Sequence, residues 1–333
     1  MKGQLPERFQ ILPATVPFYV PGFRALDSGE NFVLAPGPVD CGSWFDDFVA
    51  RVSQAVGVAH LPVCRMSDGE FLLLFGAQPP STRHPLPRRI RIRCRQAIEQ
   101  IRSRFFGFRA CTAPGISSGA MSYAEIANQR LVLSRAYGDV ASKGILALHL
   151  SHSRVPFQEQ YFPAVGRWLK QENISLTLAN YAPFYFVYGL LRGPAFSRLV
   201  AGRRLLVVHS AVGAKRDAIV KSLQAVGPRS IEWLGISATR SFAETLDLSR
   251  LQEKPDICLI GAGVGKAALF PQLEPLQVPC IDAGYTFEVW ADPDRQWDRP
   301  FMTPDSDMDV SRVRYLSKAD YAALAARSSR ATT

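Results

Sequence analysis

The sequence predicts an α/β protein with a Rossmann-like, mostly parallel sheet that carries helices on both faces. The pattern of apolar residues supports this prediction. After residue 203, runs of consecutive apolar residues alternate with segments of helical periodicity. Strands that are buried on both faces read as such continuous runs, as in parallel sheets covered by helices. Sheets of this kind bind ligands at the carboxyl ends of their strands, so the loops that follow the strands are the places to search for a site.

The first part of the chain has a less regular pattern. Residues 1–45 are rich in proline, glycine and aromatic residues, and we expect an irregular arm there. A catalytic domain is expected over 46–290 and a polar tail over 291–333. The elements expected before residue 203 are helix 44–56, strand 60–66, a helix with apolar positions at 71–75, a helix after Pro87, strand 110–113, helix 120–137, strand 145–150, helix 158–172, strand 174–179 and a helical aromatic segment 180–191.

From residue 203 the alternation of strand and helix is sharper. Each strand is a short apolar run that ends in glycine or a polar residue, and each helix follows such an end. The elements expected here are strand 203–210, helix 213–226, strand 230–236, strand 255–263, helix 265–276, strand 278–284 and a short final helix near 318–327.

Composition sets the general class of the protein. The chain has 333 residues, of which 47% are hydrophobic and 20% charged, so it can bury a full core. No apolar run approaches the roughly 18–20 residues of a membrane-spanning helix. The N-terminal residues are interrupted by Pro6 and Pro13 and do not read as a signal peptide. The six cysteines include no C-x-x-C pair, which is typical of a reducing compartment. We therefore expect a cytoplasmic protein.

The formal net charge is +10, and most of the basic residues are arginine. An arginine excess suits a phosphate-bearing ligand, a nucleic acid or an anionic membrane, although codon bias in a GC-rich genome explains it equally well. In the helix after Pro87, Arg88, Arg91 and Arg95 would share one exposed face. A solvated face is the usual reason for this pattern, and the functional reason is contact with the inner, anionic face of the cytoplasmic membrane or with an anionic acceptor. No recognised nucleic-acid module is present, which disfavours nucleic acid as the partner.

The segment R-M-S-D-G-E, from Arg65 to Glu70, is the first candidate site. Asp68 and Glu70 flank a glycine directly after an apolar strand. Two carboxylates held about 5 Å apart repel by roughly 3 kcal/mol at an effective dielectric constant of about 20, so such a pair favours a cation or a shared proton. Oxygen ligands suit Mg²⁺ or Mn²⁺. The alternative is an ordinary surface turn in which Asp68 caps the next helix.

The segment G-A-G-V-G-K, from Gly261 to Lys266, is the second candidate. Small residues between a strand and a helix allow a phosphate to approach backbone N–H groups, and Gly261, Gly263 and Lys266 are candidate contacts. The segment nearly matches a dinucleotide fingerprint, with Asp282 at the end of the next strand as the ribose-binding acid. Two features oppose that interpretation, since Lys266 stands in the third glycine position and the motif comes late in the chain. A structural glycine-rich turn is the remaining alternative.

The third candidate follows the strand that ends near His209. Ser210, Gly213, Lys215 and Arg216 occupy the loop and the start of the next helix. Two cations at a helix N-terminus are unfavourable partners of the helix dipole unless an anion is bound there too. The commoner explanation for Lys215 and Arg216 is that they are solvated surface charges. The commoner explanation for His209 is that it is a buried, hydrogen-bonded imidazole.

Together these segments resemble the GT-D type of bacterial glycosyltransferase. That family pairs an R-x-G-D-G-E segment, whose D-x-E carboxylates bind a divalent metal, with a Rossmann-like nucleotide-sugar region. Asp68 and Glu70 match the D-x-E residues and Arg65 the arginine, whereas Ser67 replaces a glycine. The resemblance covers roughly 58–76 and 203–288.

The resemblance implies a metal-dependent glycosyltransferase that moves a sugar from a nucleoside-diphosphate sugar, UDP-linked in the first instance, to a hydroxyl of a glycan or lipid-linked acceptor. Mn²⁺ or Mg²⁺ held by Asp68 and Glu70 would stabilise the leaving diphosphate. Arg65, the 210–216 loop and the Gly261–Lys266 loop would hold the donor. Asp282 and Glu288, which follow a strand end, are candidates for the general base. Two alternatives remain open at this point. One is an NAD(P)-dependent oxidoreductase that uses the glycine-rich loop, and the other is an arginine-rich polyanion binder.

Overall fold

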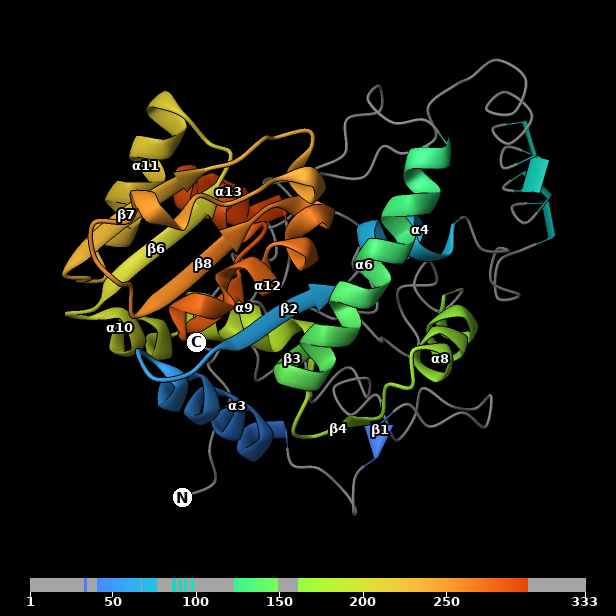
Figure 1. Ribbon diagram of the computed structural model, residues 1–333, viewed down its shortest axis with the longest axis horizontal. Coiled ribbons are helices and arrows are strands. Elements are labelled where there is room, and N and C mark those ends of the chain that lie inside the picture. Colours follow the sequence, from blue (N-terminus) through green and yellow to red (C-terminus); the bar gives the residue numbers. More distant parts are fainter. Residues whose placement is uncertain are drawn as a thin grey trace, which may run out of the picture.

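The computed structural model describes residues 33–34, 41–66, 68–76, 123–148 and 161–298, together with four pairs of residues between 86 and 98. Within these ranges seven strands form one sheet in the order β5-β3-β2-β9-β8-β6-β7, and every neighbouring pair is parallel (Figure 1). The predicted α/β class and parallel sheet are therefore confirmed. The strands are β2 (Leu61–Met66), β3 (Ile145–Leu148), β5 (Tyr181–Pro183), β6 (Arg204–His209), β7 (Ser230–Gly235), β8 (Ile257–Gly261) and β9 (Pro279–Asp282).

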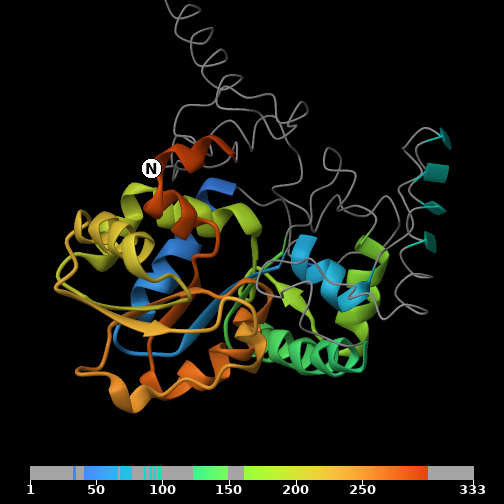
Figure 2. The same ribbon diagram turned by 90° about the horizontal axis from the view of Figure 1, so that it is seen from above.

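Helices cover both faces of this sheet, as Figure 2 shows most clearly. One layer contains α3 (Cys41–Ala55), α9 (Phe184–Arg192), α10 (Pro194–Val200), α11 (Gly213–Gln224) and α13 (Thr286–Ala291). The opposite layer contains α6 (Tyr123–Lys143), the 3-10 helix η4 (Gly263–Ala268) and α12 (Phe270–Leu273). Two further helices, α4 (Asp68–Phe75) and α8 (Phe162–Gln171), pack beside α6. None of the described helices is both long enough and apolar enough to span a bilayer.

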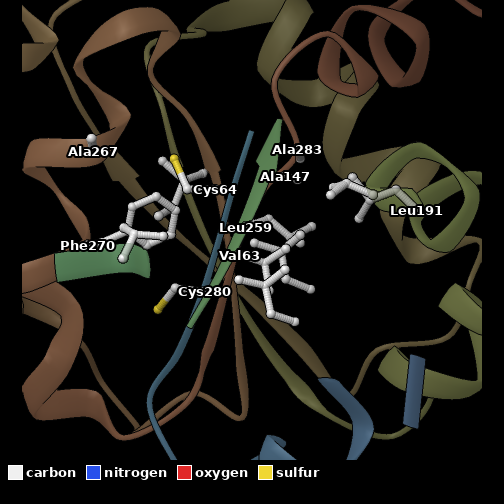
Figure 3. Packing of buried hydrophobic residues seen from close by; sticks show 14 of the residues in the cluster. Val63, Cys64, Ala147, Leu191, Leu259, Ala267, Phe270, Cys280 and Ala283 are labelled. Carbon is white, nitrogen blue, oxygen red and sulfur yellow. The ribbon is translucent and has the colours of Figure 1, made fainter. Parts of the chain in front are cut away.

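The central strands are apolar because they are buried on both faces. All residues of β3 and β9 are buried, and only the first residue of β2 is partly exposed. Figure 3 shows consecutive residues of β2 pointing to opposite layers: Cys64 lies toward Ala267 and Phe270, and Val63 toward Leu191. This alternation explains why the sequence pattern is a continuous apolar run rather than a polar–apolar alternation.

Several expected elements differ from those observed. The helix expected over 265–276 is broken into η4, α12 and η5 (Glu274–Leu276), because Pro271 and Pro275 remove backbone donors from a regular helix. The strand expected over 174–179 is only β4 (Leu176–Thr177), which pairs with β1 (Val33–Leu34) outside the main sheet. The segment 180–191 begins as β5 before it becomes α9, so it is not helical throughout. Strand 110–113 and helix 318–327 lie outside the described residues.

The order of the strands creates a switch point at the carboxyl edge of the sheet. After β6 the chain enters α11 in one layer and continues outward to β7, whereas after β8 it enters η4 in the opposite layer and continues inward to β9. Connections that leave neighbouring strands in opposite directions open a crevice above their carboxyl ends, which is where open α/β sheets bind ligands. The residues that follow β2, β6, β8 and β9 are thus brought to one edge.

Candidate functional site

Four charged side chains meet at the carboxyl edge of the sheet and are almost completely buried. We call them the ion cluster: Arg65, Glu70, Lys266 and Asp282, each with at most 7% of its surface exposed. They come from β2, α4, η4 and β9, which are distant in the sequence but adjacent around the ends of the central strands. Two cations and two carboxylates give the cluster a net charge of zero.

Asp282 and Arg65 form the first half of the ion cluster. Asp282 ends β9, and its Oδ1 accepts a hydrogen bond from Arg65 Nη2 at 3.0 Å. Its Oδ2 accepts from Arg65 Nε and from the Arg65 backbone N–H, both at 3.2 Å, and the guanidinium lies 4.3 Å from the ring centre of Tyr188. Gly284 has a φ of +41°, and a Cβ placed there would lie 1.8 Å from Arg65 Nη2. Glycine at 284 is therefore required both by the turn and by the arginine.

Lys266 forms the second half by bridging two carboxylates. Its Nζ lies 3.0 Å from Asp282 Oδ2 and also donates to Glu70 Oε1. Lys266 is in η4, directly after β8, and Glu70 is in the first turn of α4, directly after β2. Glu70 and Lys266 are 196 residues apart in the sequence. Their contact brings the D-x-E segment and the glycine-rich loop together.

Electrostatic interactions within the cluster outweigh the cost of burial. Burial raises the pKa of Asp282, but Arg65 and then Lys266 lower it by more than burial raises it. The pKa of Asp282 therefore lies below its ordinary value. Burial lowers the pKa of Lys266, yet Asp282 and then Glu70 raise it above its ordinary value. Asp282 and Lys266 therefore both stay charged at neutral pH. Because both oxygens of Asp282 are engaged, its position favours charge balancing over the predicted role of general base.

Two buried hydroxyl groups have no hydrogen-bond partner among the described residues, and the first of them lies within the electrostatic influence of Glu70 and Asp282. They are Tyr137 Oη, on α6, and Thr286 Oγ1, at the start of α13 after β9. Burial first, and then the charge of Glu70, raise the pKa of Tyr137 well above its ordinary value, so the phenol stays protonated. A buried hydroxyl without a partner costs about 1–3 kcal/mol, which makes bound water or a ligand the expected partner at this edge.

The glycine-rich loop fits against the protein itself. A Cβ at Gly261 would lie 2.3 Å from His209 Cδ2 and 2.5 Å from the Phe287 ring, and one at Gly265 would lie 2.4 Å from the Phe242 backbone. Close packing therefore explains these two glycines, as expected for a structural glycine-rich turn. Gly263 has a φ of +53° at the start of η4, a turn that favours glycine. With Asp282 buried, no ribose-binding acid is available at the end of β9.

The loop after β6 is the open part of the edge. Gly213 has a φ of +54°, and a Cβ there would meet nothing within 4 Å. Ser210 is half-buried, whereas Gly213, Lys215 and Arg216 are exposed at the beginning of α11. Lys215 Nζ lies 2.6 Å from Glu288 Oε1, and the Arg216 guanidinium lies 5.4 Å from the centre of the Trp233 ring. The exposed backbone N–H groups of the α11 N-terminus are suited to an anion.

The divalent metal implied by the resemblance can be tested against this geometry. Within the described residues no group of three or more His, Cys, Asp or Glu side chains could hold a metal, and the Asp68 side chain is outside the description. The cation that Glu70 contacts is Lys266. A bare divalent ion beside this ammonium would be repelled, whereas an ion that arrives with a diphosphate brings compensating negative charge. The ammonium beside Glu70 therefore disfavours a bare divalent ion more than one that carries a diphosphate.

Sequence reasoning named all four cluster residues as candidates, Arg65 through its place in the motif, and their roles in a site stay predictions. It missed that they pair with one another. It also missed Tyr137, whose position in a helix far from every motif carries no sequence signal. Arg88 and Arg95 lie outside the described residues, and Arg91 is helical and exposed.

Comparison with known proteins adds no family to this description: no protein-family model, no curated protein and no solved structure matches the chain.

His209, at the end of β6, gives a testable property of this edge. Its Nδ1 accepts a hydrogen bond from the Ala211 N–H at 2.9 Å, and its ring lies 4.5 Å from that of Phe287. Burial, followed by the charge of Lys215, lowers the pKa of His209 from 6.5 to about 4. The imidazole is therefore neutral at physiological pH, with its proton on Nε2.

We expect the His209 resonances to titrate near pH 4 in an NMR titration. Between pH 6.5 and 4 the unfolded chain binds a proton at this residue that the folded chain does not, so stability falls as the pH falls, by up to about 3 kcal/mol. The variant His209→Gln should lose this part of the pH dependence. A His209 titration near 6.5 would contradict the buried, neutral imidazole.

Proposed function

We propose that this chain is a metal-dependent glycosyltransferase that uses a nucleoside-diphosphate sugar as donor, UDP-linked in the first instance, and a hydroxyl of a glycan or lipid-linked glycan as acceptor. The observation that carries the proposal is the contact between Lys266 and Glu70. It joins the D-x-E turn to the loop after β8 at the switch-point edge of a parallel sheet, where such sheets bind nucleotides.

In this proposal the residues at the carboxyl edge of the sheet have three separate roles. The carboxylates of Asp68 and Glu70 would hold Mn²⁺ or Mg²⁺, which, when bound, supplies positive charge to the leaving diphosphate. Lys266 and Arg65 hold Glu70 and Asp282 in place, so the cluster is rigid before the donor binds. The open loop at Gly213 offers backbone N–H groups and the nearby Lys215 and Arg216 to the donor phosphates or nucleoside.

The structure favours this proposal over the oxidoreductase alternative. A dinucleotide fingerprint needs glycines that leave room for a pyrophosphate and an acid that reaches the ribose. Here the space beside Gly261 and Gly265 is occupied by the protein's own atoms, and Asp282 is fully buried and bound to Arg65 and Lys266. The first turn after β8 is also a 3-10 helix rather than the start of a long α-helix.

Calorimetric titration with UDP, GDP, CMP and NAD, each with Mn²⁺ and with EDTA, tests the proposal. We expect one nucleoside diphosphate to bind with Mn²⁺ and to lose at least tenfold in affinity with EDTA. Asp68→Asn should cause a similar loss, whereas Asp256→Asn, at the opposite edge of the sheet, should leave binding unchanged.

Binding of NAD that is indifferent to EDTA would instead support the oxidoreductase. Binding of DNA with a steep salt dependence and no nucleotide preference would support the polyanion binder. Silence from all four nucleotides would overturn the glycosyltransferase proposal.

A further inference from the structure

Two buried cysteines are paired across neighbouring central strands of the sheet. Cys258 in β8 is the register partner of Cys280 in β9, and both are fully buried free thiols. Neighbouring strands lie about 4.8 Å apart, and residues paired in register point to the same face of the sheet. That spacing falls within the roughly 4.4–6.8 Å that separates the Cα atoms of a disulfide. The register therefore allows a disulfide between these cysteines with little movement of the strands.

A histidine lies beside one of these thiols. His60 directly precedes β2, and its Nδ1 lies 3.9 Å from Cys280 Sγ. Figure 3 shows the Cys280 side chain on the side of the sheet that also holds Phe270. Because His60 is half-buried, a partly exposed residue contacts the buried sulfur. An imidazole beside a thiol can accept its proton and leave the thiolate, which is the reactive form of cysteine.

The surroundings of Cys280 favour its thiolate more than an apolar core would. Burial raises the pKa of Cys280, but hydrogen bonding with Cys258 and then with His60 lowers it to a net value of about 7. Cys64, in the neighbouring strand β2, provides the contrast. Its Sγ lies 3.8 Å from the backbone oxygen of Arg65, and burial raises its pKa well above the ordinary value. Cys258 and His60 thus distinguish Cys280 from an inert buried cysteine.

We propose that Cys258 and Cys280 are a peroxide-sensitive thiol pair, with His60 as the proton acceptor. The Cys280 thiolate attacks one oxygen of hydrogen peroxide, the O–O bond breaks, and a sulfenic acid and hydroxide form. The hydroxide takes up the proton held by His60 and becomes water. The Cys258 sulfur then attacks the sulfenic sulfur, so that an S–S bond forms, the S–O bond breaks, and a second water leaves with the Cys258 proton.

The electrons and atoms balance in this reaction, because the peroxide is reduced to two waters while the two thiols are oxidised to one disulfide. A thiol such as dithiothreitol reverses the oxidation by thiol–disulfide exchange. The site is independent of the proposed enzymatic activity, since none of its three side chains belongs to the ion cluster.

Peroxide treatment of the folded full-length chain tests the proposal. A Cys41→Ser/Cys94→Ser/Cys111→Ser background leaves three cysteines, which are Cys64, Cys258 and Cys280. After brief treatment with a small excess of hydrogen peroxide, we expect the thiols titrated in denaturant to fall from three to one and to return to three with dithiothreitol. Mass mapping of peptides should place the new bond between Cys258 and Cys280, with Cys64 still reduced.

Three variants in the same background separate the roles of the side chains. In Cys258→Ser the oxidised Cys280 has no thiol to react with, so dimedone should trap its sulfenic acid. His60→Phe keeps a ring but removes the proton acceptor, so oxidation at neutral pH should slow by roughly fivefold or more. Cys64→Ser is the matched control, and it should leave the rate and the product unchanged. Circular dichroism verifies that each variant is folded.

Two results would overturn the proposal. In the first, Cys258 and Cys280 stay reduced under conditions that oxidise the exposed Cys94 of the unsubstituted chain, as inert core thiols would. In the second, Cys64 is oxidised as fast as Cys280, which would indicate reaction of the unfolded chain instead of a specific site. Oxidation of His60→Phe at the unchanged rate would refute the assignment of His60 as proton acceptor.

Discussion

Asp282→Asn should lower the free energy of unfolding by about 3–5 kcal/mol, the cost expected when one partner of a buried ion pair is removed. The substitution leaves Arg65 and Lys266 buried without their shared carboxylate, and it points an amide N–H₂ toward donors that need an acceptor. Urea unfolding measures the change, with an unaltered slope indicating that the denatured state is unaffected.

The chain contains a matched control for this prediction. Asp256 accepts from the backbone N–H, Nε and Nη2 of Arg204, the same three donors that Arg65 offers to Asp282, but this pair lies at the amino edge of the sheet and is only partly buried. Asp256→Asn should therefore cause roughly a quarter of the loss or less, because water screens and replaces the interaction. Equal losses in the two variants would contradict the importance of burial.

The pH dependence of the ion cluster follows from its shifted groups. Because the pKa of folded Asp282 is below its ordinary value of 3.8, its contribution to stability is complete above that pH and is lost as the pH falls further. Because the pKa of folded Lys266 is above 10.5, its contribution is complete below that pH and is lost as the pH rises. Asp282→Asn should thus flatten the acid limb of the stability profile.

Lys266→Met is the second variant with a large expected effect. It keeps the volume of the side chain but removes the ammonium that Glu70 and Asp282 share, so we expect a loss of about 3–5 kcal/mol. Adding Glu70→Gln removes one of the two carboxylates left without that cation. The double variant should then be more stable than the sum of the single losses by about 2 kcal/mol, as measured by a double-mutant cycle in urea. Strict additivity would show that the two residues do not interact.

The fold could be predicted from the sequence to the extent that burial leaves a pattern. The runs that became β6, β8 and β9 are apolar because both faces are covered, and each ends in a polar or glycine residue at the carboxyl edge. The break in the helix after β8 was not predicted, although Pro271 and Pro275 stand in that segment. By contrast, the short β5 and the separate β4 depend on long-range pairing that local periodicity does not record.

The same contrast between local pattern and long-range contact applies to the candidate site. The loops after β2, β8 and β9 were recognisable one by one, but their contact depends on β9 lying between β2 and β8. Without that order, a lysine in a glycine-rich loop suggests a phosphate contact, and an aspartate at a strand end suggests a ribose contact or a base. With it, Lys266 and Asp282 belong to one neutral ion cluster.

If the proposed function is right, the neutral cluster should accept a divalent ion together with a diphosphate more readily than the ion alone. Titration of Mn²⁺ into the protein, followed by electron paramagnetic resonance of the free ion, tests it directly. Without nucleotide we expect weak binding, and with saturating UDP, or whichever nucleoside diphosphate binds, at least tenfold tighter binding that Asp68→Asn abolishes. Mn²⁺ that binds equally tightly with and without nucleotide would contradict the account.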